Sequence, residues 1–168
     1  MTTAIAKPHA NVVAEQLIGR DYLSFSAIST YTTCPLKFFF RYVEGLPEET
    51  VSSALVFGAG IHAAAELWFN ELITGNPAPD HDTLLAAFWN SWQGRNDELP
   101  IRYNKNEDIN SIGQLADRVL NAFRQSEFAN PNGTIIAIEE ELRGELIPGV
   151  PDFLGRIDLI VEIGRAHV

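Results

Sequence analysis

The chain has 168 residues, of which 46% are hydrophobic and 20% are charged, and its formal net charge at pH 7 is −10. This length fits one domain, and a domain of this size buries roughly 68–70% of its unfolded surface. The longest apolar stretches, 54–61 and 134–138, are much shorter than the ~20 residues of a membrane-spanning helix. Composition therefore predicts a folded protein that does not cross a membrane.

The amino-terminal residues 1–22 show no sustained hydrophobic periodicity, so we predict a loose leader there. Lys7 is the only basic residue before Arg20, and no apolar run follows it, so no signal peptide is predicted. The single cysteine, Cys34, cannot form an internal disulfide. The cytoplasm is therefore the expected compartment.

The negative charge is unevenly distributed along the chain. Residues 1–45 contain four basic and three acidic side chains, a balance of +1, so residues 46–168 carry −11. An acidic chain is a poor non-specific ligand for nucleic acid, because such binding depends on Lys and Arg. The acidic charge does not count against a site that binds divalent cations through carboxylates.

Two short helices are expected at the start of the organised sequence. Ser24 or Ser26 suits the N-cap of the first helix, and Pro35 suits the first turn of the second. Gly45 suits the position just after the second helix ends. Helical spacing favours a core role for the aromatic segment 38–42, although exposed aromatic side chains could instead stack single-stranded bases.

The predicted longer helices span 52–74, 82–92 and 109–128. Gly58 and Gly60 lie in the first of them, and because glycine is costly in a helix, they predict close backbone packing. Asp82 is expected to cap the second helix. Residues 94–108 are polar and are predicted to be irregular.

The sequence changes character after Asn130-Pro-Asn-Gly, a strong breaker of secondary structure. A strand is predicted from Thr134 onward, followed by a turn at 148–151 and a second strand over 153–162. Helices thus precede a hairpin. Because a two-stranded ribbon alone is marginally stable, we expect it to belong to a larger sheet.

Several acidic residues and one histidine form the candidate chemistry. His62 and Glu66 lie one helical turn apart, as two metal ligands would, although such a pair is more often a surface hydrogen bond. Asp158 lies in an apolar strand, where a carboxylate is costly to bury unless it binds a metal or a donor; the alternative is an aspartate that faces solvent. Three carboxylates, Glu139, Glu140 and Glu141, lie where the first strand meets its turn; most such runs are solvated, although one of them could reach the same site.

Three segments in this order resemble the PD-(D/E)XK nuclease superfamily, and within it the RecB-like branch. They are Leu23-Ser-x-Ser-x-Ile-x-x-Tyr-x-x-Cys-Pro-x-x-Phe-x-x-Arg-Tyr, Phe57-Gly-x-x-x-His-x-x-x-Glu, and Glu139 followed by Gly155-x-x-Asp. The resemblance covers about residues 23–162. It implies a restriction-endonuclease-like α/β core, α+β in the part present, with amino-terminal helices followed by the first strands of a mixed sheet.

The resemblance also implies a catalytic site. The family's metal ligands correspond to His62 and Asp158, which would hold Mg²⁺ or Mn²⁺, and the implied catalytic set is Asp158, His62 and Glu139. Family members continue into a strand with (Asp/Glu)-x-Lys, whose lysine orients the nucleophile or stabilises charge on the phosphate. No such motif follows Asp158. Residues 23–162 are therefore interpreted as a partial nuclease domain, truncated at its carboxyl end and inactive as it stands.

The expected function is a metal-dependent DNA nuclease, either exonuclease or endonuclease, in recombination, repair or phage replication. DNA is the expected partner, with Lys37 and Arg41 as candidate phosphate contacts. The alternatives are a non-catalytic DNA-binding or assembly module of the same fold, and a small helical interaction protein. In iron–sulfur members the first cluster cysteine lies in the Cys-Pro context of Cys34; the other three cysteines are missing here, so we interpret Cys34 as a small buried hydrophobic residue. A cluster is considered only for a longer protein.

Residues 163–168, Ile-Gly-Arg-Ala-His-Val, are predicted to be a non-native tail. These six residues match the translation of the start of a common sequencing adapter. The alternative is a chance match at a genuine carboxyl terminus.

Overall fold

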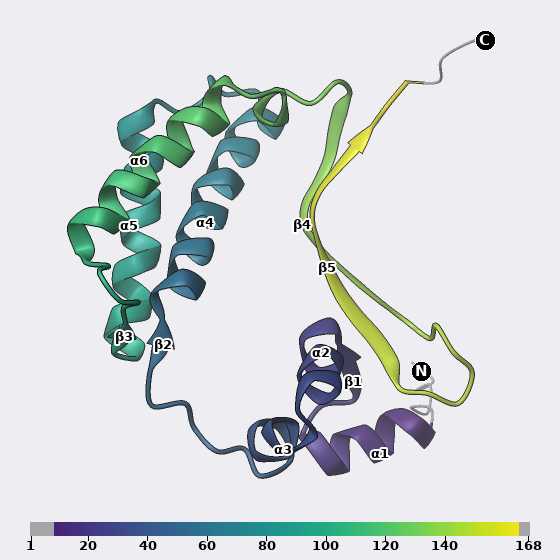
Figure 1. The fold of residues 1–168 in the computed structure, drawn as a ribbon. Helices are drawn as coiled ribbons and strands as arrows, with labels where there is room; N and C mark the ends of the chain where they lie inside the picture. The colour runs from purple at the N-terminus through teal and green to yellow at the C-terminus, as the bar shows by residue number, and fades with distance from the viewer. Residues whose placement is uncertain (1–8, 165–168) are drawn as a thin grey trace. The chain divides into compact units, whose positions relative to one another are not determined.

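The computed structural model describes residues 9–164, which divide into two compact units. Unit 1 contains residues 9–47 and 140–157, and unit 2 contains residues 48–139 and 158–164. The chain therefore leaves unit 1, builds unit 2, and returns to each of them once more through a long hairpin (Figure 1).

The helices are α1 (His9–Ile18), α2 (Phe25–Thr33), α3 (Pro35–Phe38), the π-helical turn η1 (Phe39–Val43), α4 (Ser53–Ile73), α5 (His81–Glu98), α6 (Ile109–Gln125) and the 3₁₀ turn η2 (Glu127–Ala129). The strands are β1 (Tyr22–Ser24), β2 (Val51–Ser52), β3 (Ile101–Arg102), β4 (Thr134–Gly144) and β5 (Asp152–Glu162). One sheet has the order β1-β5-β4, with β1 parallel to β5, and β2 pairs with β3 in parallel. Helices followed by a mixed sheet are the predicted restriction-endonuclease-like order. None of the described helices combines the length and apolar character needed to cross a bilayer.

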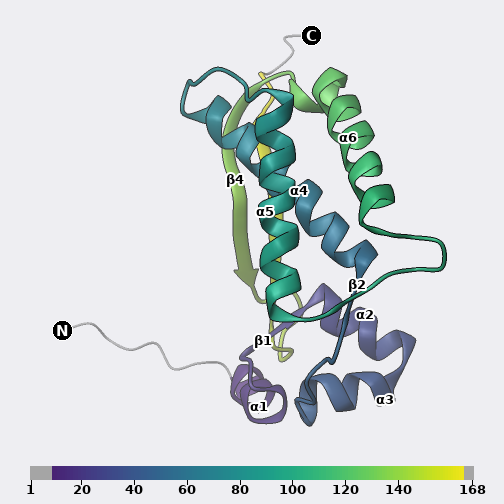
Figure 2. The same cartoon turned by 90° about the vertical axis from the view of Figure 1, so that its left-hand side faces the viewer.

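Helices α4, α5 and α6 of unit 2 lie side by side and enclose its hydrophobic core (Figure 2). The largest fully buried apolar side chains are Val56, Leu84, Phe88, Ile112 and Leu120. These residues come from all three helices, so each helix contributes an apolar face to the core. Ile135 and Ile138 of β4 and Leu159 of β5 pack against the same core, so each hairpin strand has an anchor in unit 2.

The ends of these helices are fixed by side-chain caps. Ser52 caps α4, and Asp108 caps α6 in a reciprocal capping box with Ser111. Asp80, rather than the predicted Asp82, caps α5: its Oδ1 accepts a hydrogen bond from the Thr83 backbone N–H at 2.8 Å. Hydrogen bonds from the side chain and backbone of Thr83 lower the pKa of Asp80.

Helix α5 continues to Glu98, past the predicted end at Trp92, and β3 follows at Ile101. The prediction of an irregular segment over 94–108 is therefore wrong for its first half. Gly94 does not end the helix, because its cost of about 1 kcal/mol is small beside the packing of α5 against its neighbours.

Unit 1 contains a helix where we predicted a loose leader. Residues 9–18 form α1, so that prediction is wrong for the described part of 1–22; residues 1–8 lie outside the described residues. The Asn11 side chain, 2% exposed, donates to Asp152 Oδ2 at 2.9 Å and accepts from the Asp152 backbone N–H at 2.8 Å. The helix thus depends on a partner far away in the sequence, which local periodicity cannot show.

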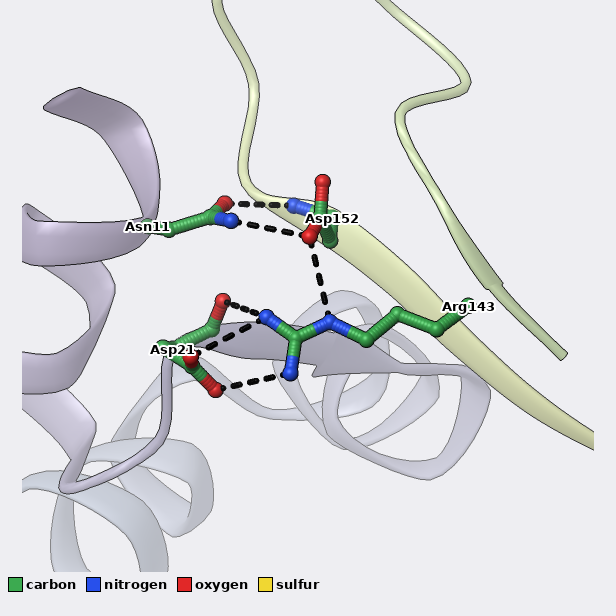
Figure 3. A network of polar contacts seen from close by, with 4 residues as sticks. All are labelled: Asn11, Asp21, Arg143 and Asp152. Carbon is green, nitrogen blue, oxygen red and sulfur yellow. Dashed lines mark hydrogen bonds and ion pairs between the residues drawn. The ribbon is translucent and has the colours of Figure 1, made fainter. Parts of the chain in front are cut away.

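Arg143 of β4 extends this network (Figure 3). Its guanidinium donates to a carboxylate oxygen of Asp152, and to the side chain and backbone carbonyl of Asp21, each at 3.1 Å. These hydrogen bonds raise the pKa of Arg143. The register of β1 on β5 places Tyr22 opposite Asp152, so the network lies at the start of that strand pairing.

The core of unit 1 is small. Its buried residues, among those described, are Asn11, Ala14 and Ala27. The prediction that segment 38–42 belongs to a core is therefore wrong for Phe39 and Phe40, which have 42% and 44% of their surface exposed. The described part of unit 1 supplies no apolar layer large enough to cover these rings.

Cys34 is also exposed, so its interpretation as a buried hydrophobic residue is wrong. It lies between α2 and α3 and is the C-cap of one and the N-cap of the other. The predicted roles of Ser24, Pro35 and Gly45 at the ends of these short helices are confirmed.

The predicted tail at 163–168 is described for two of its six residues. Ile163 is 77% exposed, and a Cβ added at Gly164 would meet no atom within 4 Å. Residues 165–168 lie outside the described residues, and the assignment of the tail stays a prediction.

The two glycines of α4 provide a matched test of the core. A Cβ at Gly60 would lie 2.6 Å from the ring of Phe88, which is fully buried, whereas a Cβ at Gly58 would meet nothing within 4 Å. The predicted close packing is confirmed for Gly60 and wrong for Gly58. We expect Gly60→Ala to lower the free energy of unfolding by about 1–3 kcal/mol through overpacking. Gly58→Ala should raise it by up to about 1 kcal/mol through helix propensity.

Urea denaturation of both variants, followed by circular dichroism, measures the two changes. Equal effects of the two substitutions would contradict the packing of α4 against Phe88.

Candidate metal centre

The imidazole of His62 lies between two carboxylates in unit 2. Its Nδ1 is 3.2 Å from Glu139 Oε1, and its Nε2 is 2.9 Å from Asp158 Oδ1. His62 comes from α4, Glu139 from β4 and Asp158 from β5. The predicted approach of His62 and Asp158 is thereby confirmed, and Glu139 is the member of the three-glutamate run that reaches the same place.

Glu66 joins the group from the next turn of α4. One ligand atom each from His62, Glu66 and Glu139 lie within 4.8 Å of one another. Gly60 and Ala64 are buried, and around the helix His62 lies about 200° from Gly60 and Glu66 about 200° from Ala64. His62 and Glu66 therefore point away from the contact of α4 with Phe88, while the buried Phe69 shares their side of the helix one turn further on.

Glu139 has an unusual backbone conformation. Its φ is +54°, and it is one of two described non-glycine residues with positive φ. Left-handed conformations are unfavourable for residues with a Cβ, and they concentrate at functional sites. The Glu139 side chain is 19% exposed, less than the side chains of His62 and Asp158, which are 45% and 73% exposed. Glu140 is exposed, and Glu141 lies 4.0 Å from the Arg156 guanidinium instead.

Asp158 is exposed. Its side chain keeps 73% of its surface accessible, so the argument that its burial requires a metal or a donor does not apply. The neighbouring Leu159 packs against the core and fixes the strand at this point. The evidence for Asp158 as a site residue is therefore its contact with His62 and not its burial.

The two contacts of His62 limit what the site can do. A neutral imidazole has one nitrogen with a lone pair and one with a proton. An ion bound to one ring nitrogen would therefore be shared with the carboxylate on that side. The carboxylate on the other side would accept a hydrogen bond from the remaining N–H and fix the orientation of the ring, as carboxylates beside metal-bound histidines do.

Lys37 and Arg41, the candidate phosphate contacts, belong to unit 1. Lys37 is exposed on α3, and Arg41 lies in η1 with its guanidinium 5.7 Å from the centre of the Tyr42 ring. The structure therefore assigns the predicted metal ligands and the predicted phosphate contacts to different units.

Comparison with protein families gives one match. Residues 22–168 match the family model described as the PD-(D/E)XK nuclease superfamily. The match covers most of the chain and includes His62, Glu66, Glu139 and Asp158. It also includes residues 163–168, and so it does not separate them from the domain. No curated protein matches the chain.

The left-handed conformation of Glu139 leads to a stability prediction. Because glycine adopts positive φ freely, Glu139→Gly should be more stable than Glu139→Ala by about 1 kcal/mol, although both remove the carboxylate. Glu141 lies in the same strand without positive φ, so there the order should reverse and the alanine variant should be the more stable. Urea denaturation of the four variants checks this. A glycine variant at 139 that is no more stable than the alanine variant would contradict the strained backbone.

Proposed function

Because the chain belongs to the PD-(D/E)XK nuclease superfamily, we propose that residues 23–162 form a metal-dependent deoxyribonuclease domain of the RecB-like type. Nucleases of this superfamily generally use divalent metals, and a nuclease domain implies DNA as substrate. Within this proposal the domain acts in DNA recombination, repair or phage replication. His62, Glu139 and Asp158 form its catalytic site.

One observation carries the proposal: the two nitrogens of a single imidazole face carboxylates from two different strands. Ion pairs on protein surfaces are common, but they usually involve long flexible side chains and contribute little. Here a helix and both strands of a hairpin converge on one ring. Each of these elements is anchored in the core of unit 2 next to its site residue, through Gly60, Ile138 and Leu159.

The donor atoms fit a divalent cation. Carboxylate oxygen and imidazole nitrogen are ligands for Mg²⁺ and Mn²⁺. Ligands at neighbouring corners of an Mg²⁺ octahedron lie about 2.8–3.0 Å apart, as hydrogen-bonded atoms also do, and His62 Nε2 lies 2.9 Å from Asp158 Oδ1. When bound, such an ion polarises the phosphodiester and lowers the pKa of a water molecule.

Within the proposal, His62 and Asp158 hold the ion. Glu139 accepts a hydrogen bond from the Nδ1–H of His62 and keeps the ring in position, and the restricted backbone and low exposure of Glu139 favour this role. Glu66 adds negative charge at the same place. If instead Glu66 and Glu139 share the ion with Nδ1, Asp158 takes the orienting role.

The chain lacks an (Asp/Glu)-x-Lys sequence. None of its three lysines, Lys7, Lys37 and Lys105, has an acidic residue two positions earlier. The group that would stabilise charge on the phosphate is therefore missing from these 168 residues. We propose that they bind metal without hydrolysing DNA. The same observation favours the alternative function, a non-catalytic DNA-binding or assembly module.

The first test of this proposal is metal binding. We expect one Mn²⁺ site, whose affinity falls at least about tenfold in His62→Ala and in Asp158→Asn, since changes in second-shell partners alone cost 10–100-fold. Isothermal titration calorimetry and Mn²⁺ electron paramagnetic resonance measure this affinity. Glu139→Gln should lose about tenfold, and Glu66→Gln less.

The matched control is the other histidine–carboxylate pair of unit 2. His81 Nε2 lies 2.8 Å from Asp117 Oδ1, and Asp117 is also well exposed. Asp117→Asn should leave Mn²⁺ affinity unchanged. Larger losses from Glu66→Gln and Glu139→Gln than from Asp158→Asn would move the ion to the Nδ1 side of His62.

The second test is hydrolysis. The 168-residue chain should leave linear and nicked DNA intact with Mg²⁺ or Mn²⁺, whereas a longer chain that supplies an (Asp/Glu)-x-Lys strand should cleave it. One electrostatic donor of this kind typically contributes ~10²–10³ in rate. Asp158→Ala should abolish cleavage by the longer chain. Metal-dependent cleavage by the 168-residue chain would refute the missing-group argument, and an inactive longer chain would favour the non-catalytic alternative.

A further inference from the structure

Unit 1 presents aromatic rings beside basic side chains. We name Tyr31, Lys37, Phe39, Phe40 and Arg41 the aromatic–basic surface. Its three rings are 55%, 42% and 44% exposed in chain order, and Lys37 and Arg41 are exposed. Large aromatic side chains carry much apolar area, so a group of them left open on a small unit marks an interaction surface.

The charge of this segment differs from that of the whole chain. Residues 25–43 contain Lys37 and Arg41 and no acidic residue, in a chain whose net charge is −10. The same stretch is rich in hydroxyl groups: Ser26, Ser29, Thr30, Tyr31, Thr32 and Thr33. Within this stretch of sequence, cations and hydroxyl groups occur without a carboxylate, a composition that is complementary to a phosphate backbone.

The rings rest on a fixed base. Phe38 is half-buried, with its ring centre 5.4 Å from that of Tyr31 and 5.0 Å from that of Tyr42. Phe39 and Phe40 pack edge to face, with centres 5.7 Å apart. Arg41 lies over Tyr42 at 5.7 Å. The segment is therefore ordered locally while its outer rings stay accessible.

We propose that the aromatic–basic surface binds a single strand of DNA, with bases stacked on Phe39 and Phe40 and phosphates held by Lys37 and Arg41. Exposed aromatic rings offer a face to any unstacked base, and basic side chains follow the backbone. The faces of duplex bases are already covered by their neighbours, so the rings select a single strand. The choice of DNA as partner rests on the proposed nuclease function.

Two other occupants are less well matched. A partner protein would also cover the exposed aliphatic side chains of this region, Leu36 and Leu46, and its binding would tolerate leucine in place of the rings. An anionic membrane would be attracted by the two cations, but it gains nothing specific from ring faces. Replacing rings by leucine, which keeps apolar area and removes the flat face, therefore separates the proposed strand from both.

The experiment measures binding of a fluorescein-labelled oligothymidylate by fluorescence anisotropy in EDTA. We expect Phe39→Leu/Phe40→Leu to weaken binding about fivefold or more, because stacking on one aromatic side chain contributes at least that much per base. Phe128→Leu is the control, since Phe128 is 73% exposed and belongs to unit 2. It should bind as the unchanged chain does.

A charge variant keeps the proposal testable if the leucine variant does not fold. Lys37→Gln/Arg41→Gln should reduce the slope of log affinity against log salt by about 0.7 for each cation that contacts a phosphate of a single strand. Lys105→Gln, which removes an exposed lysine of unit 2, should leave the slope unchanged.

Three results would overturn the proposal: no binding of the oligonucleotide by the unchanged chain, equal binding by the ring variant, or equally tight binding of a duplex of the same length. Capture of phosphatidylserine vesicles without oligonucleotide binding would also overturn it and would identify a membrane surface. EDTA removes the divalent ion, so a failure here leaves the metal-binding and cleavage results standing. A failure of those tests likewise leaves the strand-binding result intact.

Discussion

The close approach of α4 and α5 at Gly60 is the constraint on which the candidate site depends. The backbone of α4 meets the buried ring of Phe88 there, and a single methyl group would not fit. Because this contact fixes the rotation of α4 about its axis, it also fixes the direction of His62 and Glu66, which point away from Phe88. The rigid helix core thus determines the direction of two site residues before the hairpin adds the others.

The hairpin brings the remaining carboxylates to that face. Ile138 and Leu159, which pack on the core, each lie next to a site residue in the sequence. Asp158 is therefore placed by its hydrophobic neighbour and not by its own burial, whereas the Glu139 side chain is itself mostly buried. This explains how an exposed aspartate can hold a defined position, because its strand is fixed one residue away.

Much of this arrangement could be predicted from the sequence. Periodicity located α4, α6 and the hairpin, and spacing together with family resemblance selected His62 and Asp158. The features that could not be predicted depend on contacts between residues far apart in the sequence, or on the lack of an apolar layer that would cover a side chain. Helix α1 is held by Asn11 and Asp152, 141 positions apart, and the left-handed backbone of Glu139 has no sequence signal. The rings of Phe39 and Phe40 have helical spacing, but the described part of unit 1 offers no layer to cover them.

Three carboxylates lie around one imidazole in a chain whose net charge is −10. Like charges at such distances repel one another, and the left-handed conformation of Glu139 adds a further cost. One positive charge on the imidazole would offset only part of the repulsion among three carboxylates, whereas a divalent cation carries two positive charges and would offset more of it. Arrangements that cost stability persist where function requires them. The same argument applies to unit 1, where exposed rings and an acid-free segment bring no gain in folding. These two features are the basis of the proposed cation site in unit 2 and of the proposed strand-binding surface in unit 1.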